Sequence, residues 1–227
     1  MEPWGNERSF GRTAKTSTIA RRIASINAAH RTASQPSPTA DPTVMAVWAG
    51  IRRVHGTAAD QAAPISVPLL RRMVEAAPPG PAGARDRALL LVGFAAALRR
   101  SELVALDVAD AEERDEGLAV TIRRSKTDQE GAGSQVGVPY DSNPLTCPVR
   151  SLRSWLELAG ITDGPLFRPV DRHGRISPAR LSPAGANRLV QRAVARTGAD
   201  PRPYSAHSLR AGLATAAAEA GCPNGRS

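Results

Sequence analysis

Apolar residues recur at helical spacing in two stretches near the N-terminus. The first predicts a helix from Ser17 to His30, with its isoleucines on one face. An aspartate–proline pair at positions 41–42 supplies an N-cap and a first-turn proline for a second helix, which Gly56 ends. The apolar positions are Ile19, Ile23 and Ile26, then Val44, Val47, Trp48, Ile51 and Val54. We therefore expect a short helical unit here.

From Pro68 onward the pattern restarts and predicts a larger helical unit. The stretch from Arg85 to Leu98 is apolar nearly all round, so this helix is expected to be central and buried. Its neighbours are expected to be amphipathic. They are a helix over Leu69–Val74, a short one over Glu102–Leu106 capped by Ser101, and helices over Pro148–Gly160, Pro183–Gly198 and Ser205–Ala220.

The apolar period changes to two in the middle of this unit. Apolar residues alternate from Leu118 to Ile122 and again from Val136 to Tyr140, with the polar stretch Thr127–Gly133 between them. This alternation predicts a β-hairpin. The expected fold class is mainly α with a small β-hairpin or sheet (α+β).

Composition divides the chain at its polar connections. We expect a disordered tail over 1–15, a helical region over 16–57, a linker over 58–67 and a larger domain over 68–227. The N-terminal part, residues 1–84, is the more basic by density, because it holds ten of the 30 basic and only five of the 21 acidic residues.

The net charge of +9 favours a polyanionic partner. Aromatic residues are only 4% of the chain, which argues against base stacking on single strands and favours phosphate contacts on double-stranded DNA. Two cysteines, Cys147 and Cys222, make neither a disulfide framework nor a zinc site. The apolar run from Ala88 to Leu98 is too short to span a membrane. We expect a soluble, cytoplasmic protein without metal or membrane partner.

Three short segments carry candidate chemistry. The stretch from Ala97 to Leu103 places two arginines beside a glutamate, but it also reads as surface arginines with a capping serine. The stretch from Arg123 to Asp128 contains one of only two lysines, Lys15 being the other, but it also reads as a solvated turn. His207 and Arg210 are three positions apart on one helix face, where together they can hold a phosphate, although this pairing is common by chance.

In this order and spacing, the three segments resemble the tyrosine recombinase (phage integrase) family. The resemblance runs from about Thr16 to Ala220 and is strongest over Arg85–Leu106 and Tyr204–Ala214. It implies that residues 16–57 are similar to an incomplete core-binding region that contacts DNA, with Arg21, Arg22, Arg52 and Arg53 as candidate DNA-binding residues. It also implies that residues 68–227 are similar to an incomplete catalytic domain.

The resemblance also implies a role for each pocket residue. Arg99 and Arg210 match the two arginines that clamp the scissile phosphate, and Glu102 would buttress Arg99. Lys126 matches the general acid toward the leaving 5′-hydroxyl, and His207 matches the histidine that assists proton transfer at the nucleophile. The reaction needs no metal or other cofactor, because a 3′-phosphotyrosyl link stores the phosphodiester energy.

The nucleophilic tyrosine of that family has no match here. Its place is a few tens of residues after Arg210, and the two tyrosines of this chain, Tyr140 and Tyr204, both precede it. We expect Tyr204 to pack or bond locally. The pattern also has fewer helices before the linker than the family, so the sequence predicts a recombinase shortened at both ends, by a disrupted reading frame or by truncation.

Three functions stay open at this point. The chain is a DNA recombinase and integrase by descent that is defective in strand cleavage, working beside other recombinase protomers on DNA. Alternatively, it is a DNA-binding module without chemistry that occupies recombination sites. The third alternative is a remnant that folds poorly.

Overall fold

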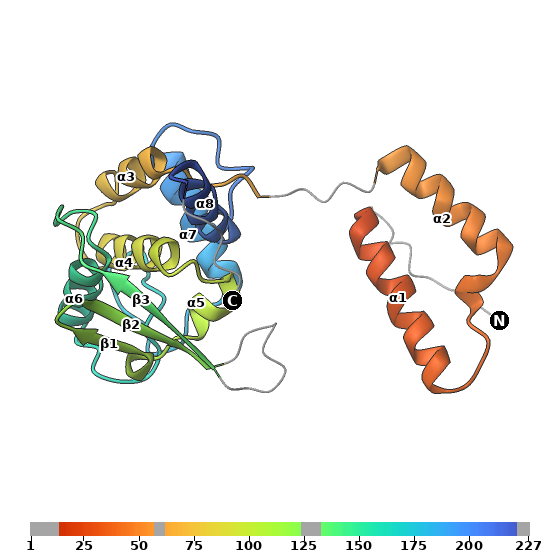
Figure 1. The fold of residues 1–227 in the computed structure, drawn as a ribbon, viewed down its shortest axis with the longest axis horizontal. Coiled ribbons are helices and arrows are strands. Elements are labelled where there is room, and N and C mark those ends of the chain that lie inside the picture. The colour runs from red at the N-terminus through yellow and green to blue at the C-terminus, as the bar shows by residue number, and fades with distance from the viewer. Residues whose placement is uncertain (1–13, 57–61, 124–132, 222–227) are drawn as a thin grey trace. The chain divides into compact units, whose positions relative to one another are not determined.

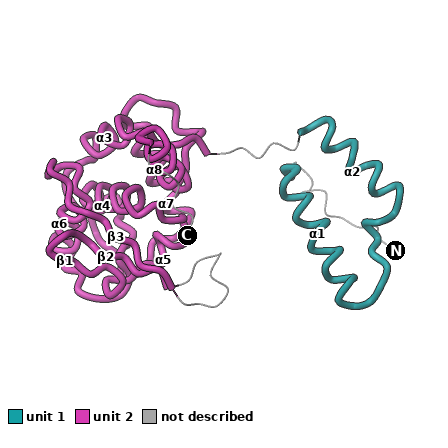
Figure 2. The backbone as a smooth tube through the Cα atoms, in the orientation of Figure 1, with its two compact units in different colours: residues 1–61 teal, residues 62–227 magenta. Residues whose placement is uncertain are grey.

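The structure is a computed structural model that describes residues 14–56, 62–123 and 133–221. The chain divides into two compact units, Met1–Gln61 and Ala62–Ser227 (Figure 2). The expected tail over 1–15 lies almost entirely outside the described residues, and so does the first part of the expected linker, residues 58–61.

Unit 1 is a helical hairpin of α1 (Thr16–Thr32) and α2 (Pro42–His55), joined through the short 3-10 helix η1 (Pro38–Ala40). Both predicted helices are therefore confirmed. Asp41 caps α2, accepting the Thr43 amide at 2.8 Å. The Asn27 side chain of α1 accepts the Ser37 hydroxyl at 2.6 Å and so fixes the connection onto the helix.

Unit 2 contains six helices, one 3-10 helix and three strands among the described residues (Figure 1). They are α3 (Val67–Glu75), α4 (Pro81–Ala95), α5 (Arg100–Ala105), η2 (Val108–Asp110), β1 (Ala111–Arg114), β2 (Gly117–Ile122), β3 (Ser134–Pro139), α6 (Pro148–Ala159), α7 (Pro183–Arg196) and α8 (His207–Glu219).

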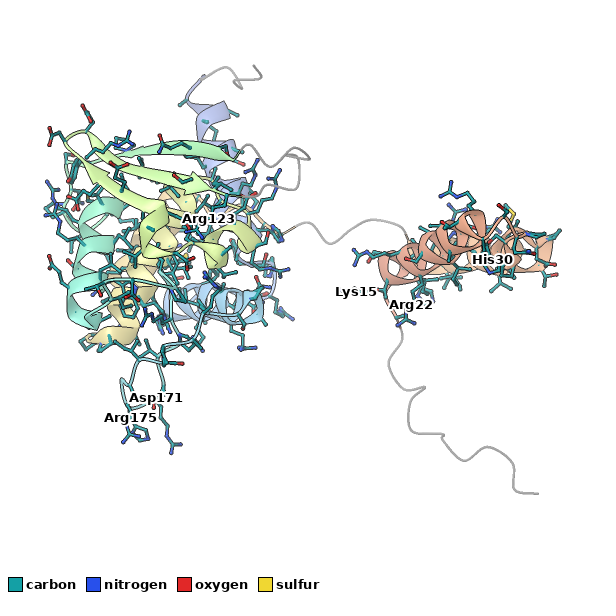
Figure 3. The ribbon with its side chains drawn as sticks, turned by 90° about the horizontal axis from the view of Figure 1, so that it is seen from below. Lys15, Arg22, His30, Arg123, Asp171 and Arg175 are labelled. Carbon is teal, nitrogen blue, oxygen red and sulfur yellow. The ribbon has the colours of Figure 1, made fainter. Side chains whose placement is uncertain are left out.

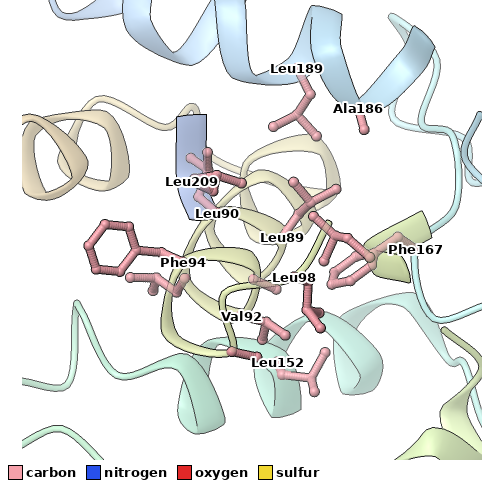
Figure 4. Packing of buried hydrophobic residues seen from close by; sticks show 14 of the residues in the cluster. Leu89, Leu90, Val92, Phe94, Leu98, Leu152, Phe167, Ala186, Leu189 and Leu209 are labelled. Carbon is pink, nitrogen blue, oxygen red and sulfur yellow. The ribbon is translucent and has the colours of Figure 1, made fainter. Parts of the chain in front are cut away.

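Helix α4 is the centre of unit 2, as its apolar sequence predicts. Leu89, Leu90 and Val92 have no exposed surface and point to different sides of the helix. Figure 4 shows Leu209 of α8, Leu152 of α6 and Leu189 of α7 packed around it. The Trp155 ring of α6 is fully buried, and its indole N–H donates to the Leu166 carbonyl at 2.9 Å.

The start of α4 corrects the sequence prediction. The helix begins at Pro81, four residues before the predicted Arg85, because this proline occupies the first helical turn, where a missing amide costs nothing. The sequence analysis took the proline- and glycine-rich stretch as the end of one helix, whereas it also begins the next.

The predicted hairpin is part of a three-stranded antiparallel sheet in the order β1–β2–β3. Leu118 pairs with Val138 and Val120 with Val136, which confirms the predicted pairing of the two alternating stretches. The additional strand β1 reads AEER and is mostly exposed, so no apolar alternation marked it. The tip of the hairpin, residues 124–132, lies outside the described residues.

Candidate phosphate-binding site and nucleic-acid interface

Arg99 lies in the turn between α4 and α5. The chain leaves α4 through Ala97, which has a left-handed φ of +49°, and Leu98 is fully buried immediately before the arginine. Burial of Leu98 fixes the backbone at the point where the Arg99 side chain departs.

Glu102 holds Arg99 by two contacts. Its carboxylate accepts the Arg99 backbone amide at 2.8 Å and the Arg99 guanidinium at 2.7 Å. Glu102 is 6% exposed, so the guanidinium is held by a carboxylate that is largely shielded from water. The predicted cap Ser101 is wrong: Arg99 is the N-cap residue of α5, because the Glu102 carboxylate satisfies its amide from the third helical position.

Helix α8 brings His207 and Arg210 to the same turn. The Arg210 guanidinium donates to the Ala97 carbonyl at 2.7 Å, which joins residues 113 positions apart in the chain. His207 is the first residue of α8, and Arg210, three residues later, lies on the same face of the helix. The structure thus brings Arg99, His207 and Arg210 to neighbouring elements.

Two glycines allow α8 to approach α4 this closely. A Cβ atom at Gly93 of α4 would lie 2.9 Å from the side chains of Leu103 and Leu209. One at Gly212 of α8 would lie 2.1 Å from the Ile65 carbonyl oxygen. Side chains at these positions would push the helices apart and separate the Arg210 side chain from the turn that carries Arg99.

The electrostatics of the site favour a neutral His207. Partial burial lowers the pKa of His207 below its ordinary value, and the positive charge of Arg100 lowers it further. A neutral imidazole is both a donor and an acceptor of protons near neutral pH. Arg100 was not among the predicted site residues, and only its adjacency to Arg99 could have suggested it.

Two side chains of α7 form hydrogen bonds with the backbone of the turn before α8. The Asn187 side chain accepts the Ala206 amide at 3.0 Å, and the Gln191 side chain donates to the Tyr204 carbonyl at 3.2 Å. The Tyr204 side chain packs against the hydrophobic core, which confirms the local role expected for it.

The second tyrosine, Tyr140, is also engaged in a local contact. It follows β3, and its hydroxyl donates to the Glu113 carboxylate of β1 at 2.5 Å. The Arg153 guanidinium of α6 binds the same carboxylate. Tyr140 thus ties the sheet to α6.

Lys126 lies outside the described residues, so the structure does not place the predicted general acid. The described chain reaches Arg123, the residue after β2, labelled in Figure 3. Its guanidinium binds Asp110 at 2.6 Å and Asp107 at 3.2 Å. The base of the hairpin is therefore fixed next to the C-terminal end of α5.

The predicted DNA-binding arginines are exposed on unit 1. Arg21 and Arg22 belong to α1, and Arg52 and Arg53 belong to the last turn of α2. The Arg52 guanidinium lies over the Trp48 ring, 5.5 Å from its centre, and this cation–π contact orders the side chain at the surface.

Neither a metal centre nor a membrane span is found among the described residues. No group of three or more histidine, cysteine, aspartate or glutamate side chains in them is arranged to hold a metal ion. Likewise, none of the described helices is long and apolar enough to cross a bilayer.

Comparison with known proteins identifies relatives of this chain. A homologue of the integrase/recombinase XerD from Selenomonas ruminantium is 36% identical over 210 residues, which cover 91% of this chain and 62% of that protein. The chain thus spans less than two thirds of the length of this relative.

Solved structures share the fold at lower identity. The XerA recombinase is 19% identical, with a TM-score of 0.52, and the match covers 92% of this chain and 70% of that one. The XerH site-specific recombinase, solved with a palindromic difH substrate after cleavage, is 18% identical, with a TM-score of 0.53, over 73% of this chain and 44% of that one. The mainly helical fold with a small three-stranded sheet is therefore that of the Xer recombinases.

The model of the phage integrase family matches residues 69–225, which is more than half of the chain and includes both arginines of the site. This chain belongs to the phage integrase family.

Proposed function

We propose that this chain binds double-stranded DNA as a tyrosine-type site-specific recombinase and holds one scissile phosphate between the α4–α5 turn and the first turn of α8. The observation that carries the proposal is that the guanidinium groups of Arg99 and Arg210 are both anchored at the α4–α5 turn. Glu102 fixes Arg99, and the Ala97 carbonyl, two residues away, fixes Arg210. Two permanent positive charges so arranged suit a phosphodiester.

In the proposed mechanism, the two arginines neutralise the non-bridging oxygens of the phosphate. Negative charge grows on these oxygens as the phosphorus becomes five-coordinate, so fixed positive charges stabilise the transition state more than the ground state. Where a tyrosine hydroxyl is supplied to attack, neutral His207 accepts or returns its proton, and Lys126 donates a proton to the leaving 5′-oxygen. A phosphoester bond to the tyrosine oxygen forms as the bond between phosphorus and the 5′-oxygen breaks, and the 5′-oxygen leaves as a hydroxyl. Rejoining reverses this exchange, so no cofactor is needed.

We further propose that a polypeptide of these 227 residues binds DNA without cleaving it. No tyrosine follows Arg210 in the sequence. The hydroxyl of Tyr140 is engaged with Glu113, and the Tyr204 side chain packs on the core. We therefore propose that neither tyrosine hydroxyl attacks the phosphate.

Unit 1 is proposed to be the second DNA contact, similar to a core-binding region. Its charge supports this, because the described part carries exposed arginines on both helices and Asp41 as its one acidic residue. XerH has been solved with its difH substrate, and lambda integrase has been solved as a dimer on a core site. By analogy, we propose DNA and other recombinase protomers as partners of this chain.

The phosphate site is tested by DNA binding at several salt concentrations. Arg99→Ala and Arg210→Ala are each expected to weaken binding about tenfold or more, because each removes a charge-assisted contact. Arg188→Ala is the matched control, since it removes an equal charge from the exposed surface of α7. Equal weakening by all three substitutions would mean that the pocket has no special role.

Strand cleavage is tested with a nicked duplex that carries the attachment site and traps covalent intermediates. The wild-type chain is expected to give a mobility shift without a covalent adduct. A protein–DNA adduct that survives denaturation would overturn the proposed defect, and its tyrosine could be mapped by mass spectrometry.

The second candidate function is a DNA-binding module that occupies recombination sites without chemistry. The exposed arginines of unit 1 favour it. Deletion of residues 1–61 separates the two candidates. If binding lies mainly in unit 1, the deletion abolishes it and Arg99→Ala has little effect. If the phosphate pocket dominates, unit 2 alone retains an affinity that Arg99→Ala removes.

A further inference from the structure

Arg180 holds the C-terminal end of the helix whose N-terminal end carries Arg99. The guanidinium of Arg180, in the connection between α6 and α7, donates to the carbonyls of Val104 at 2.9 Å and Leu106 at 3.0 Å. These are carbonyls at the end of α5, where helical partners are lacking. A cation also interacts favourably with the negative end of the helix dipole.

Helix α5 needs such support because it has only six residues. Isolated helices shorter than about 12 residues are marginal in water, since the cost of nucleation is spread over few hydrogen bonds. At its N-terminal end the Glu102 carboxylate accepts the Arg99 amide. Arg180, which is more than 70 positions away in the chain, provides the matching contact at the C-terminal end.

The same guanidinium begins a series of ion pairs that runs from Arg180 to the base of the hairpin. Arg180 binds one oxygen of Asp107 at 2.5 Å, and the other oxygen of Asp107 binds Arg123 at 3.2 Å. Arg123 in turn binds Asp110, which is 4% exposed. A cleft of about 280 Å³ lies between α5 and β2, and its lining includes Glu102 and Arg123.

We propose that Arg180 is a positioning residue for Arg99: it fixes α5 at its C-terminal end and thereby sets the Glu102–Arg99 pair toward the phosphate. This inference rests on the proposed function and adds to it a residue that belongs to none of the three motifs. Arg180 acts through α5, since its donors point to that helix and to Asp107 rather than into the pocket.

Two variants test this with opposite changes of charge. Arg180→Ala lowers the net charge of +9 by one, and Asp107→Asn raises it by one. Arg180→Ala removes both contacts with the carbonyls at the end of α5. Asp107→Asn removes the carboxylate charge that holds the Arg180 guanidinium beside these carbonyls. Both are expected to fold, because the Leu106 carbonyl and the Val108 amide also pair with the backbone of Leu166 and Gly164.

The matched control is Arg175→Ala. Arg175 lies in the same connection as Arg180, in the turn after Asp171 that projects from unit 2 in Figure 3. Asp171 binds the backbone amide of Arg175 at 2.9 Å, so this turn keeps its shape without the Arg175 side chain.

The readout is the protection of Arg99 by duplex DNA against phenylglyoxal, an arginine-specific reagent, with the modified residue located by mass spectrometry. In the wild type and in Arg175→Ala, DNA is expected to slow modification of Arg99 strongly. In Arg180→Ala and Asp107→Asn, this protection is expected to fall about tenfold, with thermal unfolding still cooperative. Arg180→Lys keeps the charge without the planar fork and is expected to restore part of the protection.

The outcomes separate this inference from the proposed function. If Arg99 of the wild type gains no protection from DNA, the proposed function fails. If the wild type is protected and both variants are protected equally, only the positioning role of Arg180 is overturned. If Arg180→Ala weakens protection while Asp107→Asn strengthens it, Arg180 acts as a simple charge, which also overturns the inference.

Discussion

The two units of this chain bury their apolar residues to very different extents. Neither helix of unit 1 has a buried residue, and Met45, Val47 and Val54 of α2 are more than half exposed. Unit 2 surrounds α4 with fully buried side chains from α6, α7 and α8.

This difference shows which interactions stabilise each unit. Unit 2 is held by burial of apolar area, which stabilises by about 25 cal/mol per Å² and fixes the helices that carry Arg99 and Arg210. The described part of unit 1 relies on caps and on the Asn27 contacts, so its helices contribute surface charge rather than a core. The proposed phosphate site needs side chains that are fixed by a packed core, whereas the exposed arginines of unit 1 that we propose to contact DNA do not.

The largest expected contrast comes from one tryptophan in each unit. Trp155→Ala removes a fully buried ring and its hydrogen bond to the Leu166 carbonyl, so it should destabilise unit 2 by about 3–5 kcal/mol. Trp48→Ala, on partly exposed α2, should leave the main unfolding transition within about 0.5 kcal/mol of wild type. Urea unfolding followed by circular dichroism measures both, and comparable losses would contradict the contrast.

A methyl group added at Gly212 should have the next largest effect. The new Cβ of Gly212→Ala would meet the Ile65 carbonyl at 2.1 Å and the Phe94 ring at 2.8 Å, so α8 must shift. We expect a loss of about 1–3 kcal/mol in thermal unfolding, with DNA binding reduced because Arg210 moves with the helix. Normal DNA affinity in a destabilised variant would argue that α8 does not place Arg210.

The same change at Gly50 of α2 should have the opposite sign. A Cβ at Gly50 meets no atom within 4 Å, so Gly50→Ala adds helix propensity without a clash. It should stabilise α2 by about 0.5–1 kcal/mol, seen as a gain in helical circular dichroism. A loss of helix would mean that unit 1 packs closely around Gly50.

The smallest expected effect is the pH response of His207. Its pKa is lowered in the folded chain, so the unfolded chain binds more protons just below the ordinary histidine pKa. This contribution to stability is complete above about pH 6.5 and is lost as the pH falls through the lowered pKa. NMR titration of the imidazole should give a pKa below that of a free histidine, and duplex DNA should raise it, because a phosphate favours the charged form. In His207→Gln the stability difference between pH 7 and pH 5 should shrink.

Much of the fold was predictable because burial leaves a period in the sequence. The apolar stretch of α4, the cap Asp41, and the alternation of β2 and β3 each predicted an element that the structure confirms. Strand β1 was not predictable, since its exposed residues AEER show no apolar period and it is defined only by pairing with β2.

The candidate site was predictable in part for the same reason. His207 and Arg210 share a helix face, and Arg99 and Glu102 are close in sequence, so local spacing made them candidates. Their roles came only from the resemblance of the ordered segments to the family. The Arg210–Ala97 contact and the Arg180 clamp join residues far apart in the chain. Such contacts depend on how the helices pack, so the local pattern of residues in the sequence does not predict them.

The bond between Arg210 and the Ala97 carbonyl has a consequence for which residues this position can accept. A guanidinium has five N–H donors in one plane, and the bond to the Ala97 carbonyl uses only a donor of Nη1. A lysine at position 210 would carry the same charge on a single nitrogen, which would have to contact both the carbonyl and the proposed phosphate. If the proposed site is correct, the number and geometry of donors matter at this position as well as the charge, so Arg210→Lys would not be a conservative exchange.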